Sequence, residues 1–128
     1  MGNLIPKPTE AELEILQVLW ENGPSTVRFV NDRLSEKREV GYTTTLKLMQ
    51  IMVDKGLAKR DTASRTHIYQ AAINESDTQE RLLKSFVQRT FRGSAMKLVV
   101  QALGSHDTSK AELDEIKALI QKIEDEQE

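Results

Sequence analysis

The hydrophobic period of the sequence changes at Gly56, and this change limits the folds that the first half of the chain can adopt. Before Gly56, apolar residues recur every three or four positions, which is typical of amphipathic helices. After it, residues 57–61 (LAKRD) and 66–72 (THIYQAA) lose this period and are two short segments joined by the polar turn DTASR. Short segments separated by such a turn predict a β-hairpin. A hairpin is therefore expected to follow a set of helices.

Three predicted helices precede the hairpin, and each carries its own start or stop signals. Thr9 and Glu12 form a capping box before the first helix, which ends at the turn ENGPS. Ser25 or Thr26 can cap the second, and the third runs from about Tyr42 to Lys55. Three helices and a hairpin in this order are the arrangement of a winged helix-turn-helix. The sequence predicts such a domain over residues 1–73.

Residues 74–128 are predicted to form three further helices, the last of which starts at a Ser109–Glu112 capping box. The first ends near Gly93, and the second covers residues 94–103. About 50 residues in three short helices bury little apolar surface by themselves. We therefore expect a dimerisation domain, so that the whole chain is mainly α with a small β-hairpin. The alternative is a bundle that folds back on the N-terminal domain. The residues expected at the dimer contact are Leu82, Phe86, Phe91, Leu98, Val99, Leu113, Ile116 and Ile120.

The distribution of charge favours a nucleic-acid partner more than the total charge does. The chain has a formal net charge of −2, but residues 41–69 carry five basic residues and two acidic ones. Phosphate contacts depend on the local field of a surface rather than on the total charge. A basic surface on the third helix and the hairpin is therefore suited to DNA, although solvated faces of mixed charge are common.

The third helix is the predicted DNA-reading element. At about 100° per residue, Thr45 faces the core, whereas Lys47 and Gln50 face away from it. Hydroxyl groups bind phosphate oxygens, Lys binds guanine, Gln binds adenine, and threonine methyls contact thymine methyls. The alternative is an ordinary amphipathic helix with a solvated polar face. The predicted DNA-binding residues are Tyr42, Thr43, Thr44, Lys47, Gln50, Ile51, Lys59, Arg60 and Arg65, the last at the tip of the hairpin.

No catalytic, metal or cofactor motif is present in the sequence. It contains no GxSxG, P-loop, HExxH or glycine-rich dinucleotide turn, and it has no cysteine. His67 and His106 are isolated, and we expect His67 on a strand surface and His106 in a polar loop. We therefore expect neither an enzyme nor a metalloprotein. The lack of a long apolar run and of a secretory signal predicts a cytoplasmic protein without membrane insertion.

Specific segments of the sequence resemble the BlaI/MecI/CopY family of bacterial transcriptional repressors, also called penicillinase repressors. They are TEAELEILQVLWENGPSTVRFVNDRL, GYTTTLKLMQIMVDKGLAKRD and YQAA, and the resemblance continues through LLKSFVQRTFRGSAMKLV. It implies a homodimer that binds a dyad-symmetric operator through its N-terminal winged helix. Members of the family often control a β-lactamase and a membrane sensor peptidase. The alternative function is a winged-helix module that docks proteins without binding DNA.

The resemblance also implies that proteolytic cleavage in the dimerisation region releases the repressor from DNA. β-Lactam-responsive members are cut at an Asn-Phe bond, whereas the corresponding stretch LVVQALG offers Gln101 and Ala102. This difference argues against a β-lactam signal, although a different peptidase could cut the same helix. Copper-responsive relatives use cysteine pairs, which this chain lacks. Ile51 stands where many relatives carry a basic residue, which predicts an altered base preference or a weaker phosphate contact.

Overall fold

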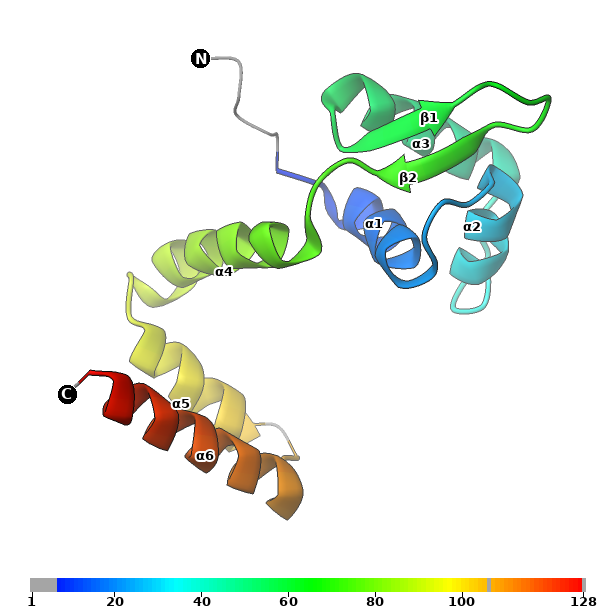
Figure 1. Cartoon of the computed structure of the whole chain (residues 1–128). Coiled ribbons are helices and arrows are strands. Elements are labelled where there is room, and N and C mark those ends of the chain that lie inside the picture. The colour runs from blue at the N-terminus through cyan, green and yellow to red at the C-terminus, as the bar shows by residue number, and fades with distance from the viewer. Residues whose placement is uncertain (1–6, 106, 128) are drawn as a thin grey trace, which may run out of the picture. The chain divides into compact units, whose positions relative to one another are not determined.

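The computed structural model describes residues 7–105 and 107–127, which are mainly α-helical with one antiparallel hairpin (Figure 1). The predictions for the N-terminal segment before Lys7 and for His106 lie outside these ranges. The mainly helical fold class with a hairpin after the third helix is confirmed. The elements, in chain order, are α1 (Glu10–Asn22), α2 (Val27–Leu34), α3 (Tyr42–Lys55), β1 (Ala58–Asp61), β2 (Ile68–Ala71), α4 (Glu75–Phe91), α5 (Ala95–Ser105) and α6 (Lys110–Glu126).

Two compact units make up the chain, and the division between them falls inside α4, between Leu82 and Leu83. The first unit contains α1, α2, α3, the hairpin and the first half of α4. The second unit contains the rest of α4, followed by α5 and α6. Each unit is described by itself below.

The helices of the first unit start at the predicted caps. Both halves of the α1 capping box form, because Thr9 N donates to Glu12 Oε1 at 2.9 Å and Glu12 N donates to Thr9 Oγ1 at 3.2 Å. Thr26 caps α2 by accepting from Phe29 N at 3.1 Å. Ser25 instead exchanges two backbone hydrogen bonds of 2.8 Å with Tyr69. Of the two candidate caps, Thr26 is therefore the one used.

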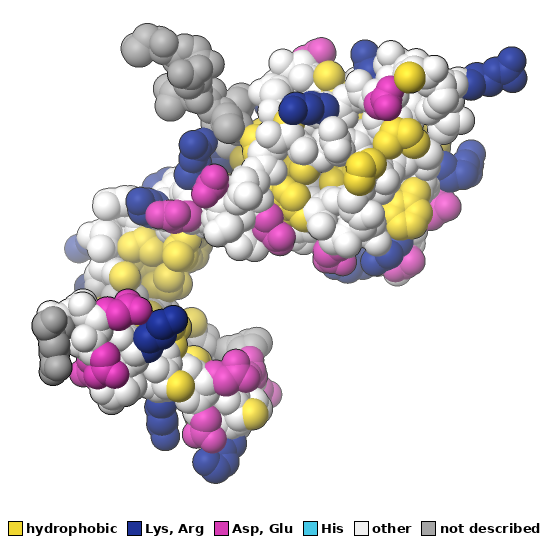
Figure 2. Space-filling model, viewed as in Figure 1, with side chains coloured by type: hydrophobic (Ala, Val, Ile, Leu, Met, Phe, Trp, Pro, Cys, Tyr) yellow, Lys and Arg dark blue, Asp and Glu magenta, His cyan; other side chains and the backbone are white. Residues whose placement is uncertain are grey.

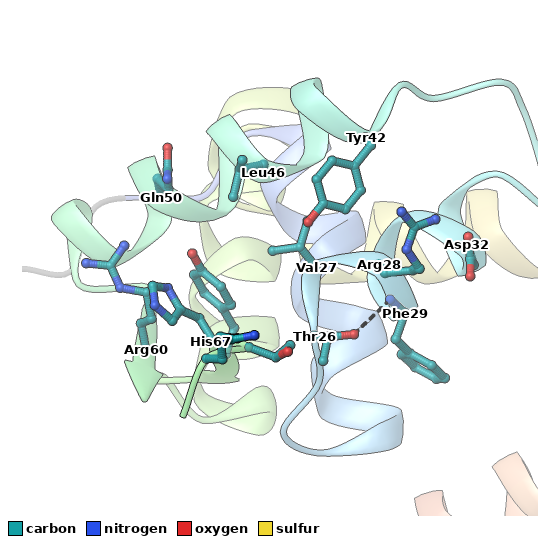
Figure 3. Close-up of a pocket in the computed structure, with 13 residues that line it drawn as sticks. Thr26, Val27, Arg28, Phe29, Asp32, Tyr42, Leu46, Gln50, Arg60 and His67 are labelled. Carbon is teal, nitrogen blue, oxygen red and sulfur yellow. Dashed lines mark hydrogen bonds between the residues drawn. The ribbon is translucent and has the colours of Figure 1, made fainter. Parts of the chain in front are cut away.

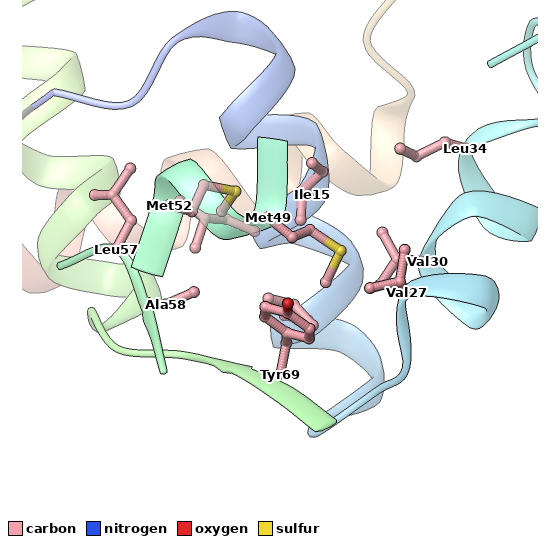
Figure 4. Packing of buried hydrophobic residues seen from close by; sticks show 11 residues of the cluster. Ile15, Val27, Val30, Leu34, Met49, Met52, Leu57, Ala58 and Tyr69 are labelled. Carbon is pink, nitrogen blue, oxygen red and sulfur yellow. The ribbon is translucent and has the colours of Figure 1, made fainter. Parts of the chain in front are cut away.

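The core of the first unit lies where the three helices meet the hairpin (Figure 4). Ile15 and Leu16 come from α1, and Met49 and Met52 from α3. Tyr69 of β2 lies among these side chains and is almost fully buried. This packing determines how α3 is presented at the surface.

The two strands are shorter than predicted. β1 and β2 have four residues each, with Ala58 opposite Ala71 and Asp61 opposite Ile68. In the connecting loop, Asp61 Oδ1 accepts from Ala63 N at 2.9 Å. Such a local side-chain to backbone hydrogen bond competes with ladder pairing and marks the end of β1 at Asp61, the predicted last residue of the first strand. The shortening lies elsewhere, at Leu57, at residues 66–67 and at Ala72.

In the second unit the predicted helices form, but their apolar side chains remain largely exposed. Ser109 and Glu112 form the predicted capping box of α6. α5 begins one residue later and ends two residues later than expected, and Ser94 Oγ accepts from Lys97 N at 3.2 Å. Among the described residues, α5 and α6 contribute no buried side chain.

A buried ion pair joins the start of α1 to the end of α3. Lys55 Nζ donates to the two carboxylate oxygens of Glu12 at 2.9 and 2.8 Å, and the Glu12 side chain is only 3% exposed. Burial raises the pKa of Glu12, but hydrogen bonds from Lys55 and Thr9 outweigh this effect and hold the pKa below its usual value.

We expect Glu12→Gln to lower the free energy of unfolding by about 2 kcal/mol at neutral pH, because a charge-assisted hydrogen bond is removed from a buried place. The pKa of Glu12 is lower in the folded state than in the unfolded state. The stabilisation is therefore complete above the unfolded pKa, near 4.3, and is lost as pH falls through the folded pKa. Urea unfolding at several pH values should show the two proteins converging at acid pH.

Glu14→Gln is the matched control, since Glu14 pairs with Arg38 at 2.7 Å on the solvent-exposed surface. Solvent screens such a pair, so this variant should change stability much less. An equal decrease in the free energy of unfolding in the two variants would contradict the conclusion that the buried Glu12–Lys55 pair stabilises the fold.

Candidate nucleic-acid interface

A groove of about 750 Å³ runs over the first unit between α2, α3 and the hairpin (Figure 3). One wall is α3, which contributes Tyr42, Leu46 and Gln50 at intervals of four residues. The other walls come from the hairpin and from the start of α2. The hairpin and α2 residues that line the groove are Arg60, Arg65, Thr66, His67 and Tyr69, and Thr26, Val27, Arg28, Phe29 and Asp32.

The orientation of α3 is set by a buried hydrogen-bond network. Thr45 is fully buried, as its position in the sequence predicted. Its Oγ1 accepts from Asn31 Nδ2 at 2.9 Å, and Asn31 Nδ2 also donates to the Val40 carbonyl at 2.9 Å. Asn31 thus joins α2, the connecting loop and α3. Rotation of α3 about its axis would break the Asn31–Thr45 hydrogen bond and leave buried polar groups without a partner, which is costly. The network therefore fixes which side of α3 faces outward.

The remaining predicted residues of α3 point outward. Thr43, Thr44 and Lys47 are exposed, as are Gln50 and Ile51. The predicted division of the helix into a core side and an outer side is confirmed. The outer side therefore presents hydroxyl, ammonium, amide and aliphatic groups from one rigid element.

The groove brings together some of the predicted DNA-binding residues but not all of them. Tyr42, Gln50, Arg60 and Arg65 line it. Lys59 lies on the hairpin beside a smaller hollow of about 400 Å³. The residues Thr43, Thr44, Lys47 and Ile51 are on the outer side of α3 but do not line the groove.

Several groove residues were missed by the sequence analysis. Arg28 and Phe29 belong to the first turn of α2, and the Arg28 guanidinium lies 5.3 Å from the centre of the Tyr42 ring. This distance is typical of a cation–π contact, which holds Tyr42 at the start of α3. His67 is exposed, as predicted, but it also lines the groove. The available signal was a basic residue, Arg28, two positions after the Thr26 cap of α2.

The charges of the groove favour an anion. Arg28, Arg60 and Arg65 line it, against one carboxylate from Asp32. Within residues 7–105 and 107–127, none of these three arginines forms an ion pair. Guanidinium groups that are not neutralised internally are suited to phosphate oxygens.

The residues that were predicted to form a dimer contact lie in the second unit, except Leu82, which is the last residue of the first unit. Phe86, Val99, Leu113 and Ile120 are exposed, whereas Leu82, Phe91, Leu98 and Ile116 are partly buried. Phe86 and Phe91 pack edge to face with 5.8 Å between ring centres. Gln101 and Ala102, the predicted cleavage region, are exposed residues within α5.

Neither a metal site nor a membrane span was found in the described part of the chain. The residues described contain no group of three or more His, Asp or Glu side chains that could hold a metal ion. No helix among them is both long and apolar enough to cross a membrane.

Comparisons with known proteins find relatives that match nearly the whole chain. The family model described as Penicillinase repressor matches residues 8–122. The penicillinase repressor of Bacillus licheniformis is 25% identical over 118 residues, which cover 92% of each chain. The methicillin resistance regulatory protein MecI of Mammaliicoccus sciuri is 21% identical over 122 residues, covering 95% of this chain and 99% of that one.

A solved structure provides the matching fold for the first unit. It is the solution structure of the Bacillus licheniformis BlaI monomeric form in complex with the blaP half-operator. The match has a TM-score of 0.50 and 27% identity, and it covers 58% of this chain and 90% of that chain. The three helices and hairpin thus have the winged helix-turn-helix fold of a DNA-binding domain. The chain belongs to the penicillinase repressor family of DNA-binding transcriptional repressors.

Proposed function

We propose that this protein represses transcription as a homodimer that binds a dyad-symmetric operator. The outer side of α3 enters the major groove, and the arginine-lined groove beside it receives one strand of the DNA backbone. One observation supports this proposal most strongly. The outer side of α3 exposes polar groups, and the groove next to it is lined by arginines that form no ion pair among the described residues. Because the proposed ligand of the protein is DNA, we propose that the protein acts in the cytoplasm.

The roles of individual residues follow from their positions. Lys47 and Gln50 contact base edges, since they lie in the middle of the outer side of α3. Thr43 and Thr44, in the first turn, donate to phosphate oxygens. Arg60 and Arg65, together with Lys59 on the hairpin, bind the flanking backbone. Tyr42, held by Arg28, closes the end of the groove.

The exposed apolar surface of the second unit supports the homodimer. Met96 is 71% exposed and Val100 is 62% exposed, both on α5. Ile120 and Ile123 are about half exposed on α6. Soluble chains rarely leave so many large apolar side chains in water unless another surface covers them. A second copy of the same unit supplies a complementary apolar surface, and a two-fold dimer matches a dyad-symmetric operator.

A gel-shift titration with the DNA fragment upstream of the protein's own gene tests the proposal. At low salt we expect retardation, and the affinity should fall steeply as salt increases. Lack of retardation at low salt would overturn DNA binding and would favour the alternative, a winged-helix domain that docks proteins.

Release of the operator is proposed to follow proteolysis in α5. Gln101 and Ala102 are exposed, and loss of the segment after them would remove α6 from the dimer contact. A membrane sensor peptidase is the proposed partner. Co-expression with such a peptidase should yield a fragment ending near Gln101, and an intact chain under inducing conditions would contradict this step.

Ile51 provides a test of base recognition. It is 41% exposed on the outer side of α3, one turn after Lys47. The thymine C5-methyl is the apolar group that base edges offer in the major groove. Replacing the contacted thymine with uracil should weaken binding by about 0.8 kcal/mol, roughly fourfold, because Ile51 then has no methyl group to bury.

The same uracil substitution should have no effect on the Ile51→Ala variant, measured by fluorescence anisotropy at constant salt. Uracil placed outside the half-site is the control and should leave both proteins unchanged. If the variant is as sensitive as the original protein at every thymine, Ile51 does not contact a methyl group.

A further inference from the structure

Tyr69 of β2 is almost fully buried, yet its hydroxyl group has no hydrogen-bond partner among the residues that the structure describes. Only 1% of the Tyr69 surface is exposed. Within residues 7–105 and 107–127, the hydrogen bonds found for this residue involve its backbone, and none involves its hydroxyl. Buried polar groups nearly always have a partner, so a group without one requires an explanation. The Tyr69 hydroxyl therefore needs a partner from outside the described residues.

The Tyr69 hydroxyl opens into the groove between α2, α3 and the hairpin. Among the described residues, no side-chain nitrogen or oxygen is both sealed from solvent and without a hydrogen bond. The Tyr69 oxygen forms no such bond, so it is in contact with solvent, and Tyr69 lines the groove. Its ring lies in the core with Met49 and Val27 (Figure 4). The hydroxyl is thus the tip of a buried side chain that reaches the floor of the groove.

The backbone on either side of the groove holds this hydroxyl in one place. Ser25 and Tyr69 exchange two backbone hydrogen bonds of 2.8 Å, which fasten β2 to the residue before the Thr26 cap of α2. The buried ring is surrounded by close-packed side chains and has little freedom to move. A donor that is already ordered loses little conformational entropy when it binds a ligand. The Tyr69 hydroxyl is therefore a preorganised donor.

Arg60 lies on the same face of the hairpin as Tyr69. The two residues are directly opposite each other in the ladder. Side chains in such a pair share one face of the sheet, and their Cβ atoms are about 4.5–5.5 Å apart. Ala58, two residues before Arg60 on this face, is buried, whereas Arg60 is exposed. The face thus passes from the core to the groove at this pair, and both members line the groove.

The charge of Arg60 is available to a ligand. Arg60 forms no ion pair among the described residues. Asp32, which also lines the groove, lies at the opposite end of it in Figure 3. In Figure 2, Lys and Arg side chains project from the end of the first unit at which the hairpin loop lies. A hydroxyl donor beside an unpaired guanidinium is suited to the oxygens of one phosphate group.

We propose that Tyr69 contacts DNA: its hydroxyl donates to one oxygen of a backbone phosphate, and the Arg60 guanidinium donates to another oxygen of the same phosphate. The proposal rests on the proposed function, in which the groove receives one strand of the DNA backbone. A backbone phosphate is favoured over a free anion because Gln50 both lines the groove and belongs to the outer side of α3. A duplex that is read by α3 therefore passes over the groove.

The test compares the full chain with Tyr69→Phe, which removes one oxygen atom and keeps the ring in the core. Because the hydroxyl has no partner among the described residues, the midpoint of thermal unfolding should be kept or raised. Arg60→Gln is the second variant. Thr78→Val is the matched control, since it removes a buried hydroxyl from the same unit. The Thr78 hydroxyl donates to the Asn74 carbonyl at 2.7 Å and does not line the groove.

Affinity is measured by fluorescence anisotropy for the fragment upstream of the protein's own gene and for an unrelated duplex of equal length. Tyr69→Phe should lower the affinity for both duplexes by about tenfold, because a charge-assisted hydrogen bond that carries no sequence information is lost. Thr78→Val should bind both duplexes as the original protein does.

The dependence on salt separates the two proposed contacts. The slope of log affinity against log salt should be unchanged in Tyr69→Phe, since this variant loses no charge. In Arg60→Gln the slope should become shallower by about 0.9 for each phosphate that is no longer neutralised.

A set of duplexes with one methylphosphonate linkage each locates the contact, because this linkage lacks the phosphate charge. One linkage should weaken the binding of the original protein more than it weakens the binding of Tyr69→Phe. The same linkage should also weaken the original protein more than Arg60→Gln, if one phosphate binds both side chains. At the other linkages, Tyr69→Phe and the original protein should lose affinity by the same factor.

Several results would overturn the inference while leaving the proposed function standing. Unchanged affinity of Tyr69→Phe, although the original protein binds DNA, would leave water as the partner of the hydroxyl. A lower midpoint of unfolding in Tyr69→Phe would give the hydroxyl a partner within the chain. Equal sensitivity of Tyr69→Phe and the original protein at every linkage would exclude a backbone contact.

Inorganic phosphate offers the same chemistry from another source. If it displaces the duplex from the original protein but not from Tyr69→Phe at constant ionic strength, and no linkage distinguishes the two proteins, the site binds a free anion and the inference fails. Failure of the original protein to bind DNA would instead overturn the proposed function itself.

Discussion

Placing an aspartate at Val99 or at Ile120 should convert the proposed dimer to monomers and reduce affinity for the full operator by about 100-fold or more. Both side chains are about half exposed in the single chain, Val99 on α5 and Ile120 on α6. Neither substitution therefore opens a cavity in the monomer. A buried, unpaired carboxylate in the subunit contact is costly, so the dimer should dissociate.

The large effect on DNA binding arises from the loss of avidity. Two linked winged helices bind two half-sites with a high effective concentration, and this gain typically reaches about 10²–10⁴. A monomer loses this gain but keeps its intrinsic affinity for one half-site. The complex of a monomeric BlaI with a half-operator shows that a relative binds in this way.

The measurement combines sedimentation velocity with titrations of full-operator and half-operator duplexes. Ala118→Asp is the matched control, because Ala118 is exposed on the side of α6 opposite Ile120. It adds the same charge to the same helix and should leave the dimer intact. A dimer that persists in the Val99 and Ile120 variants would place the subunit contact elsewhere.

Replacing Lys47 with alanine should reduce operator affinity by about 10- to 100-fold, with little change in stability. Lys47 is exposed in the middle of the outer side of α3, and no ion pair is found for it among the described residues. A lysine that binds guanine O6 and N7 contributes about 1–3 kcal/mol to the discrimination of a base pair. In the proposed dimer two protomers bind at once, so the substitution weakens the binding of both half-sites.

A duplex with 7-deazaguanine at the contacted position identifies the contact. This duplex should bind the original protein more weakly than the guanine duplex does. The affinity of Lys47→Ala should be the same for both duplexes, because that variant has no ammonium group to donate to N7. Lys37→Ala serves as the control, because Lys37 lies at a hollow formed with α1, away from the groove. If Lys47→Ala lowers the affinity by the same factor for every duplex, Lys47 contacts a phosphate and not a base.

Local sequence determined the element types and most of their ends. The capping boxes at Thr9 and Ser109 and the helix stop at Gly56 each depend on a few neighbouring residues, and all three form as predicted. The same holds for Thr45, whose inward direction follows from the helical period alone. These features need no knowledge of the rest of the chain, because hydrogen bonds within a turn and the spacing of apolar residues specify them.

The tertiary structure decided which distant side chains meet. Asn31 and Thr45 are 14 residues apart, and Glu12 and Lys55 are 43 residues apart, so no local pattern indicates either pair. The α2 side of the groove, where Arg28 holds Tyr42, depends on the same packing. The burial of Leu16, Met49 and Tyr69 in one core sets the distance and rotation of α2, α3 and the hairpin. Periodicity shows which side of a helix is buried, but only the packing of that core determines which neighbour it is buried against.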